Sequence, residues 1–242
     1  VTDSSLENNI IFENQYGIHF HDSDNNVLDG NNAHTNTQDG IYLEKSDYNT
    51  LNDNSADDNT YAGINIIQSS FNSLNRNTGN GNTRYGLRLY QASFSEFNDE
   101  SYSANSGDPI YGVYLQYANN NEFHTFEVKN NGASRHCYGI YLEGSHNNVF
   151  ESGAIDENYA SSSIYIDYAY GIFLRTSNNN HFIGNEVIHT TADYAYGIYH
   201  ESGDSNQFEG TTIAKNSDYG VYIANSESSS IYNNYFNNTN NI

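Results

Sequence analysis

Residues 138–150 read YGIYLEGSHNNVF, and nearly the same string recurs as YGVYLQYANNNEF at 111–123 and as YGIFLRTSNNNHF at 170–182. Each copy opens on tyrosine and glycine, places apolar residues one and three positions after the glycine, and closes on Asn-x-Phe. Alternation with a period of two is typical of a β-strand with one buried face. The three copies therefore predict a repeated unit made of a short strand and a turn.

The same unit runs through almost the whole chain of 242 residues, with nine anchoring glycines spaced 23 to 32 residues apart. These glycines are Gly17, Gly40, Gly63, Gly86, Gly112, Gly139, Gly171, Gly197 and Gly220. A unit of 23 residues is too short for a strand plus a regular helix, but it suits one turn of a parallel β-solenoid. We expect one all-β domain over residues 1–242, with nine to ten rungs stacked at roughly 4.8 Å.

A second fixed position lies nine residues after each glycine and holds asparagine in seven of the nine copies. We expect each of these asparagines to form a tight bend with left-handed backbone angles and to bond through its amide to the next rung. Two residues further on stands Leu, Phe or Ile, which we expect to point into the core. The 41 asparagines and the low hydrophobic content of 36% are consistent with such a narrow core.

The three quoted strings resemble the NosD-like and CASH-type repeats of the pectin-lyase-like superfamily. The resemblance covers nearly the whole chain and implies a right-handed parallel β-helix. That superfamily includes lyases, hydrolases, epimerases, tailspikes and non-catalytic surface proteins, so the resemblance implies a fold more specifically than a function. The acidic motifs of polygalacturonase-like hydrolases and the Asp-Pro-His-Glu motif of alginate epimerases are absent from the sequence.

The charge balance argues against several classes of function. Eight Lys and Arg against 30 Asp and Glu give a net charge of −22, which disfavours nucleic-acid binding because phosphate contacts need a basic surface. The sequence contains no apolar run of about 18 residues, so it predicts no transmembrane helix. The single cysteine, Cys137, excludes an intrachain disulfide, and the nine histidines share no metal-ligand spacing. We predict no metal site and no cofactor, with Ca²⁺ at acidic turns left open.

Outward-facing positions are the candidates for function. Two residues after the glycine, the last five copies carry aromatic residues only, namely Tyr114, Tyr141, Phe173, Tyr199 and Tyr222. One interpretation is that these rings merely stabilise neighbouring parallel strands. The other is an exposed aromatic column that binds a glycan or serves as a lateral interface with another rod.

Three charged residues stand four positions after the glycine on successive rungs, namely Glu143, Arg175 and Glu201. Two rungs would separate the carboxylates by roughly 9–10 Å, near the wide end of the spacing in inverting glycosidases. Insertions at 107–110, 134–137, 161–169 and 190–195 precede the glycines of these copies, and we expect them to wall a groove. If the chain is an enzyme, these three residues are the predicted catalytic group. The alternative is a favourable charge ladder between strands.

Two functions remain in competition. Repeat phase begins near Val1 and continues to Ile242 without a distinct cap, and open rungs tend to pair with other chains. The first prediction is therefore a non-catalytic structural protein, extracellular or at the cell surface, that self-associates into a filament, sheath or layer. The alternative is a polysaccharide hydrolase or lyase with its groove across the middle-to-late rungs. The predicted partners are the chain itself and a surface polysaccharide.

Overall fold

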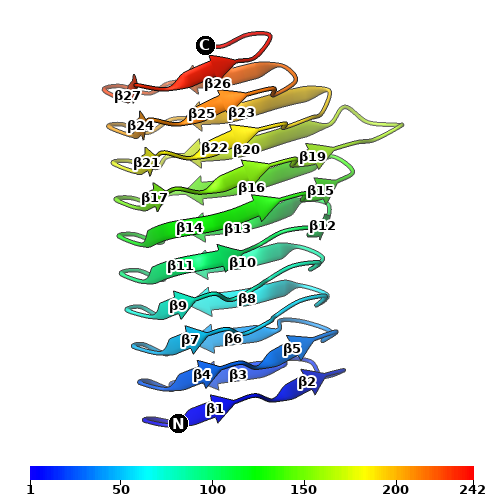
Figure 1. Ribbon diagram of the computed structural model, residues 1–242, viewed down its shortest axis with the longest axis vertical. Coiled ribbons are helices and arrows are strands. Elements are labelled where there is room, and N and C mark those ends of the chain that lie inside the picture. Colours follow the sequence, from blue (N-terminus) through cyan, green and yellow to red (C-terminus); the bar gives the residue numbers. More distant parts are fainter.

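The computed structural model describes residues 1–242 and is a right-handed parallel β-helix without α-helices (Figure 1). The rungs stack along one axis, and the two termini lie at opposite ends of the stack (Figure 1). One sheet has nine strands in a row, and the longest row of the other has ten. The prediction of nine to ten stacked rungs is therefore confirmed.

Each repeat glycine lies in or beside a strand of the nine-stranded sheet, and all pairs in this sheet are parallel. Its strands are β3 (Ile18–His21), β6 (Ile41–Glu44), β8 (Ala62–Ile67), β10 (Tyr85–Tyr90), β13 (Ile110–Gln116), β16 (His136–Glu143), β20 (Tyr168–Arg175), β23 (Tyr194–Glu201) and β26 (Tyr219–Ala224).

The second sheet, with 14 strands, forms the other faces of the helix. Its long row comprises β1 (Ser5–Glu7), β4 (Val27–Asp29), β7 (Thr50–Asn52), β9 (Ser73–Asn75), β11 (Glu96–Ser101), β14 (Glu122–Lys129), β17 (Val149–Glu151), β21 (His181–Ile183), β24 (Gln207–Glu209) and β27 (Ser230–Tyr232). From β14 it branches into β18 (Ala154–Asp156), β22 (Glu186–Ile188), β25 (Thr212–Ala214) and β28 (Tyr235–Asn237). Two small sheets complete the fold, β2 (Ile10–Phe12) with β5 (Asn32–His34), and β12 (Ser106–Gly107) with β15 (Gly132–Ala133) and β19 (Tyr159–Ala160).

The core is a single narrow column of 33 buried apolar residues inside the coil. The expected Leu and Phe positions point inward, and five phenylalanines stack directly on one another with ring centroids 4.3 to 5.0 Å apart, namely Phe97, Phe123, Phe150, Phe182 and Phe208. Equivalent residues meet because parallel strands in register place each residue above its counterpart one rung away. A low apolar content is sufficient for this fold because the core is only one coil wide.

The asparagine positions form the predicted ladder along the helix axis. The backbone N–H and the side-chain amide of Asn148 both donate to Oδ1 of Asn180, at 2.9 and 3.0 Å. The expectation about backbone angles is wrong by one residue, because the left-handed conformation belongs to the preceding position, Asn147 (φ 57°). Asn148 has ordinary angles and stays buried, so its amide can use all its bonding capacity inside the turn.

The repeat glycines are required by close approach between rungs rather than by their backbone angles. A Cβ atom on Gly139 would lie 2.5 Å from the carbonyl oxygen of Gly171 and 2.9 Å from Cγ2 of Ile155. Any side chain here would push neighbouring rungs apart, which explains why the glycine marks the period.

No helix of this chain has the length and apolar character needed to cross a bilayer.

Candidate functional site

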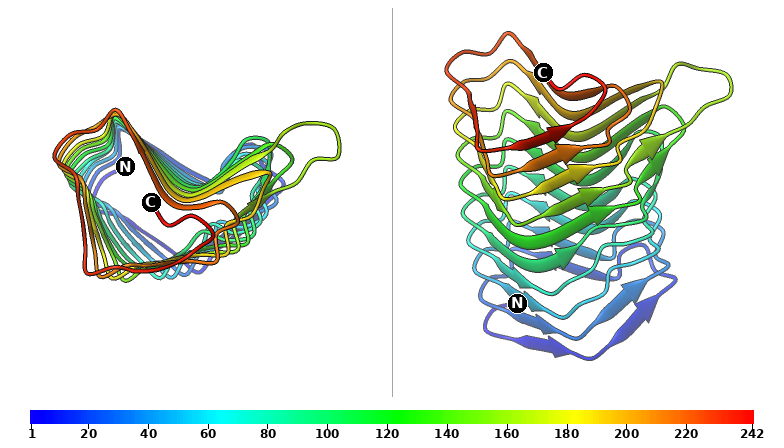
Figure 2. Two further views of the ribbon diagram at one scale, coloured as in Figure 1. Left: turned by 90° about the horizontal axis from the view of Figure 1, so that it is seen from above. Right: turned by 45° about the horizontal axis from the view of Figure 1, so that its top comes forward.

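The outer face of the nine-stranded sheet is concave when the helix is viewed along its axis (Figure 2). The strand register places the five predicted aromatic residues in one row along this face. The row is less exposed than expected, because Tyr114, Tyr141 and Phe173 are only 7 to 8% exposed. Tyr222 at the end of the row is 40% exposed.

A second row of rings covers the first. Tyr138 lies 5.0 Å from Tyr141, and Tyr170 lies 4.9 Å from Phe173, measured between ring centroids. Some neighbouring rings of the two rows are stacked, as Tyr138 and Tyr141 are with planes 22° apart, and others pack edge against face, as Tyr170 and Phe173 do at 81°. The two rows form a continuous aromatic floor, in which the rings shield one another from solvent.

A pocket of about 270 Å³ opens on this floor across β16, β20 and β23. It is lined by His136, Tyr138, Tyr141, Tyr168, Tyr170, Phe173, Arg175, Tyr199 and Glu201. Two of the three predicted charged residues and three of the five predicted aromatic residues are therefore found in one pocket.

The insertions contribute one wall of the pocket. They lengthen β16, β20 and β23 to 8 residues each, so that His136, Tyr168 and Tyr194 form a stack beside the floor. The largest insertion forms a loop that projects from the rod (Figure 2). The concave sheet and the insertion wall together define what we call the aromatic groove.

Glu143, Arg175 and Glu201 occupy equivalent positions on three neighbouring strands. Arg175 Nε donates to Glu201 Oε2 at 3.1 Å. Glu143 Oε2 accepts hydrogen bonds from the Tyr114 hydroxyl at 2.7 Å and from Gln116 Nε2 at 2.9 Å. Arg175 and Glu201 thus form one link of the expected charge ladder, whereas Glu143 is bonded to the preceding rung and not to Arg175. Arg175 and Glu201 also face the pocket.

Most of the arginines gather at the aromatic groove. Of the five arginines, Arg84, Arg88 and Arg135 lie 5.0 to 5.9 Å above tyrosine rings of this face or its wall, and Arg175 lines the pocket. Cation–π contacts hold guanidinium groups over aromatic rings without removing their charge. Half of the eight basic side chains of a strongly acidic chain are therefore placed along one groove.

The tyrosine hydroxyls of the groove are poor acids. Burial raises the pKa of Tyr141 to about 12, with a further contribution from the charge of Glu143. Burial also raises the pKa of Tyr111, Tyr138 and Tyr170 well above the usual value. These hydroxyls therefore remain protonated near neutral pH and serve as hydrogen-bond donors rather than as bases.

At the N-terminal end of the same face the aromatic rows give way to polar residues. His19 and His21 on β3 approach Glu44 on β6, with His19 Nε2 3.6 Å and His21 Nδ1 2.9 Å from Glu44 Oε2. The sequence-based prediction overlooked this group. It is visible in the repeat phase, because His21 and Glu44 are 23 residues apart at the same position of consecutive copies.

The fold and the groove define the class of protein, a right-handed parallel β-helix with an aromatic, arginine-bearing groove on one sheet. The family described as "Periplasmic copper-binding protein (NosD)" matches residues 1–124 and 94–242, and the chain belongs to this family. No curated protein sequence matches it.

The solved structures with the same fold include two epimerases that act on mannuronan or alginate and a bacteriophage tailspike. The mannuronan C-5 epimerase AlgE6 A-module of Azotobacter vinelandii is 18% identical with a TM-score of 0.76, covering 97% of this chain and 64% of its own. A T265N mutant of the periplasmic alginate epimerase AlgG is 16% identical with a TM-score of 0.68, covering 88% of this chain and 51% of its own. The tailspike protein 2 of bacteriophage CBA120 is 13% identical with a TM-score of 0.62, covering 96% and 38%. The chain thus spans about two thirds or less of these proteins, and at such identities the likeness establishes the fold alone.

Proposed function

We propose that the aromatic groove binds an anionic polysaccharide that carries uronate groups, with its chain along the helix axis over β10 to β26. The observation that carries this proposal is the concentration of arginines beside the aromatic floor in a chain of net charge −22. Two of the neighbouring structures are described as epimerases of mannuronan or alginate, which supports the choice of substrate class.

The chemistry of the groove suits such a ligand. Tyrosine rings offer flat apolar faces to the C–H face of a sugar, while their hydroxyls donate to its oxygens. Arg175 has donors beyond the one that it gives to Glu201, and a guanidinium binds carboxylates in a planar, bidentate fashion. Rungs about 4.8 Å apart repeat these contacts at a spacing close to the length of one sugar unit.

Turnover of the bound polysaccharide, by a hydrolase or lyase reaction, is the second candidate. It is favoured by the arrangement of one cation between two carboxylates on consecutive strands, Glu143, Arg175 and Glu201. In a lyase reaction Arg175 would neutralise the uronate carboxylate and one glutamate would take the proton at C5. The resulting electron pair would form the C4–C5 double bond as the bond to O4 breaks, and a proton would be returned to O4.

We further propose an extracellular or periplasmic location, in keeping with the description of the family. Self-association into a filament or layer remains a prediction that ranks below glycan binding. The lateral contact predicted for it needs exposed rings, whereas most rings of the row are packed against their neighbours.

The proposal is tested by affinity electrophoresis or calorimetry with polymannuronate, with polygalacturonate and with a neutral glucan. Replacement R175Q should weaken binding of the two polyuronates at least about tenfold and leave the weak binding of the glucan unchanged. Arg76 supplies the matched control, because it also pairs with a carboxylate one rung away, at 2.7 Å from Asp53, but lies outside the groove. Absence of polyuronate binding in the unmodified chain, or equal losses in R175Q and R76Q, would overturn the proposal.

A further inference from the structure

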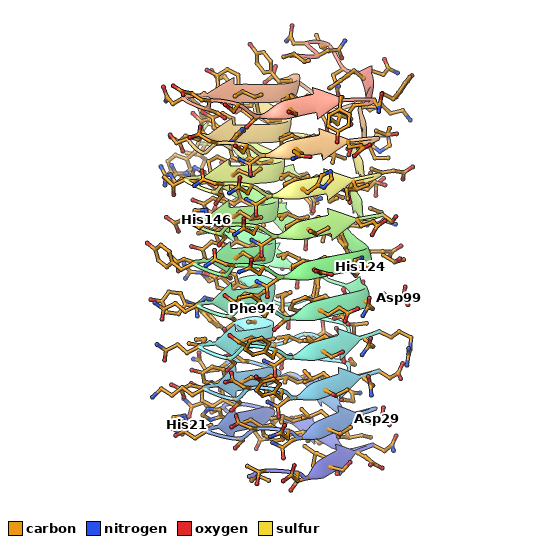
Figure 3. All side chains as sticks on the ribbon, turned by 90° about the vertical axis from the view of Figure 1, so that its left-hand side faces the viewer. His21, Asp29, Phe94, Asp99, His124 and His146 are labelled. Atoms are coloured by element: carbon orange, nitrogen blue, oxygen red, sulfur yellow. The ribbon has the colours of Figure 1, made fainter.

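We propose that the open face of the Phe94 ring is a binding site for one sugar unit of a neutral polysaccharide. The site lies outside the aromatic groove, about midway between the two ends of the rod (Figure 3), and it does not depend on what the groove binds. Phe94 belongs to the turn between β10 and β11. Because the insertions precede the strands of the nine-stranded sheet and this turn follows them, the site lies at the edge opposite the insertion wall.

Phe94 is the last of three stacked rings on the surface of successive turns, which we call the outer ladder. The rings of Tyr48 and Phe71 have centroids 5.0 Å apart and planes 7° from parallel. The rings of Phe71 and Phe94 have centroids 5.1 Å apart and planes 8° from parallel. These three side chains are 45 to 56% exposed, although large apolar side chains are normally buried. A contiguous exposed aromatic surface of this kind is typical of a binding site.

The backbone of the outer ladder is unfavourable for aromatic residues. Tyr48, Phe71 and Phe94 have left-handed angles, with φ between 57° and 58°. The same position of the next two turns holds Asn120 and Asn147 with nearly the same angles, and asparagine tolerates this conformation far better than bulky residues do. The chain thus places costly residues on three consecutive turns where its own repeat supplies a better one. Such departures from local preference are typical of functional sites.

The outer ladder leaves one face of its last ring uncovered. One face of Phe94 stacks on Phe71, and the next rung carries Asn120, whose side chain is too short to cover the other face. A pocket of about 250 Å³ lies there, lined by Phe94, Ser95, Glu96, Asn120 and Glu122. The pocket occupies the place of the next ring of the ladder, and it has room for one sugar ring.

The groups around the pocket suit a sugar that carries no charge. The C–H face of a pyranose can stack on Phe94 as a further ring of the ladder would. Glu96 and Glu122 are direct neighbours on β11 and β14, and their carboxylate oxygens can accept strong hydrogen bonds from sugar hydroxyls. Each carboxylate is also positioned within the chain, because Asn98 Nδ2 donates to Glu96 Oε1 at 3.1 Å and His124 Nε2 lies 3.5 Å from Glu122 Oε2.

The same carboxylates distinguish this site from the aromatic groove. No arginine or lysine lines the pocket, so a uronate bound there would meet two like charges without a positive charge among the lining residues. The groove instead has arginines beside its tyrosine rings. The two sites therefore select different ligands, a polyuronate in the groove and a neutral glycan at Phe94.

Tyr48, at the other end of the outer ladder, provides a matched control. It has the same position in the repeat, the same backbone conformation and a similar exposure of 56%, but it lies two rungs from the pocket and does not line it. Asparagine occupies this position in other copies, as at Asn25 and Asn120. Y48N and F94N therefore introduce a residue that suits the backbone.

The experiment measures binding of the full-length chain to a soluble mixed-linkage β-glucan by affinity electrophoresis, with saturation-transfer NMR on oligosaccharides of the same glucan. F94N should weaken binding at least about tenfold because the ring face is lost. N120F should have the same effect, because the added ring stacks on Phe94 and fills the pocket. Y48N should leave binding unchanged. Removal and addition of a ring both abolish binding only if the sugar occupies the pocket itself.

Circular dichroism establishes that each variant is folded. A chain that does not bind the glucan would overturn the proposal, as would F94N or N120F that binds like the unmodified chain. A loss in Y48N equal to that in F94N would also overturn it, because the ladder would then act as a whole rather than through the open face of Phe94. None of these outcomes bears on the groove, which is tested separately with polyuronates and R175Q.

Discussion

The hydroxyl of Tyr102 donates a hydrogen bond of 2.6 Å to Glu100 Oε2 inside the coil, where both side chains are almost completely buried. Glu100 Oε1 accepts from the backbone and the side chain of Asn77 and so ends a ladder that runs through Asn31 and Asn54. One rung on, the pairing position is taken by Phe126, which has no amide to continue the ladder. The carboxyl group of Glu100 accepts two hydrogen bonds from Asn77 on the preceding rung and one from Tyr102 on its own rung. It therefore needs no hydrogen-bond partner on the following rung.

The first prediction concerns the pH dependence of stability through Glu100. Burial raises the pKa of Glu100 from 4.5 to about 7, against the lowering effect of its hydrogen bonds. Between these values the unfolded chain loses the proton and the folded chain keeps it. The contribution of Glu100 is therefore complete below about pH 4.5 and is lost as the pH rises through about 7, a total of order 3 kcal/mol.

Replacement E100Q removes this titration. The free energy of unfolding of E100Q minus that of the unmodified chain should rise by up to about 3 kcal/mol between pH 4.5 and pH 8, measured by urea denaturation. Other carboxylates contribute equally to both proteins and cancel. Parallel pH profiles would show that the burial of Glu100 does not perturb its ionisation.

The second prediction concerns the repeat glycines. G139A should lower stability by at least about 2 kcal/mol, because the new methyl group meets the Gly171 carbonyl and neighbouring rungs must separate. Gly184 is the control, because a Cβ there meets nothing within 4 Å although φ is +60°. G184A should cost only about 1 kcal/mol of backbone strain. Equal shifts of the denaturation midpoint would contradict the close-approach explanation.

The third prediction concerns the ionisation of the groove tyrosines. Burial raises the pKa of Tyr141 and of Tyr196 to about 12, above the usual value of 10.0. Their contribution to stability is present below pH 10 and is lost as the pH rises through about 12. The tyrosinate absorbance of the folded chain should therefore lag behind that of the urea-unfolded chain above pH 10. Coincident titration curves would mean that the aromatic floor is open to water.

The fourth prediction separates binding from mere support of the strands. E201Q should strengthen polyuronate binding about threefold to tenfold, because Arg175 loses its competing partner and the groove loses a negative charge. R175Q breaks the same ion pair but should weaken binding. If the Arg175–Glu201 ion pair only stabilised the strands, E201Q and R175Q would change polyuronate binding in the same direction. That result in a binding titration would contradict the proposed role of the groove in binding.

The same E201Q variant addresses turnover. It should abolish any cleavage of polyuronate while binding persists, assayed by ultraviolet absorbance of unsaturated ends for a lyase and by reducing ends for a hydrolase. Unchanged turnover in E201Q would remove Glu201 from the catalytic group.

Contacts between residues at the same position of successive repeats, which form a column along the helix axis, could be predicted from the sequence. Contacts between residues of different columns could not. The stacking of Phe150 on Phe182 and the bonding of Asn148 to Asn180 follow from the period, because in-register parallel strands bring equivalent positions together. The adjacency of Arg175 and Glu201 follows in the same way. The burial of Tyr141 behind Tyr138 depends instead on the curvature of the sheet, for which the sequence has no simple signal.

By itself, then, the sequence determined the period, the inward and outward faces and the residues that share a column, since one-dimensional stacking converts sequence phase into spatial neighbours. The tertiary structure decided how far each outward residue is exposed and which columns meet. It turned the expected external aromatic row into a recessed floor, and it brought His19 against Glu44, two positions apart in phase. The physical reason is that contacts between different columns depend on side-chain conformations and on the curvature of the whole sheet, and neither is a property of a single repeat.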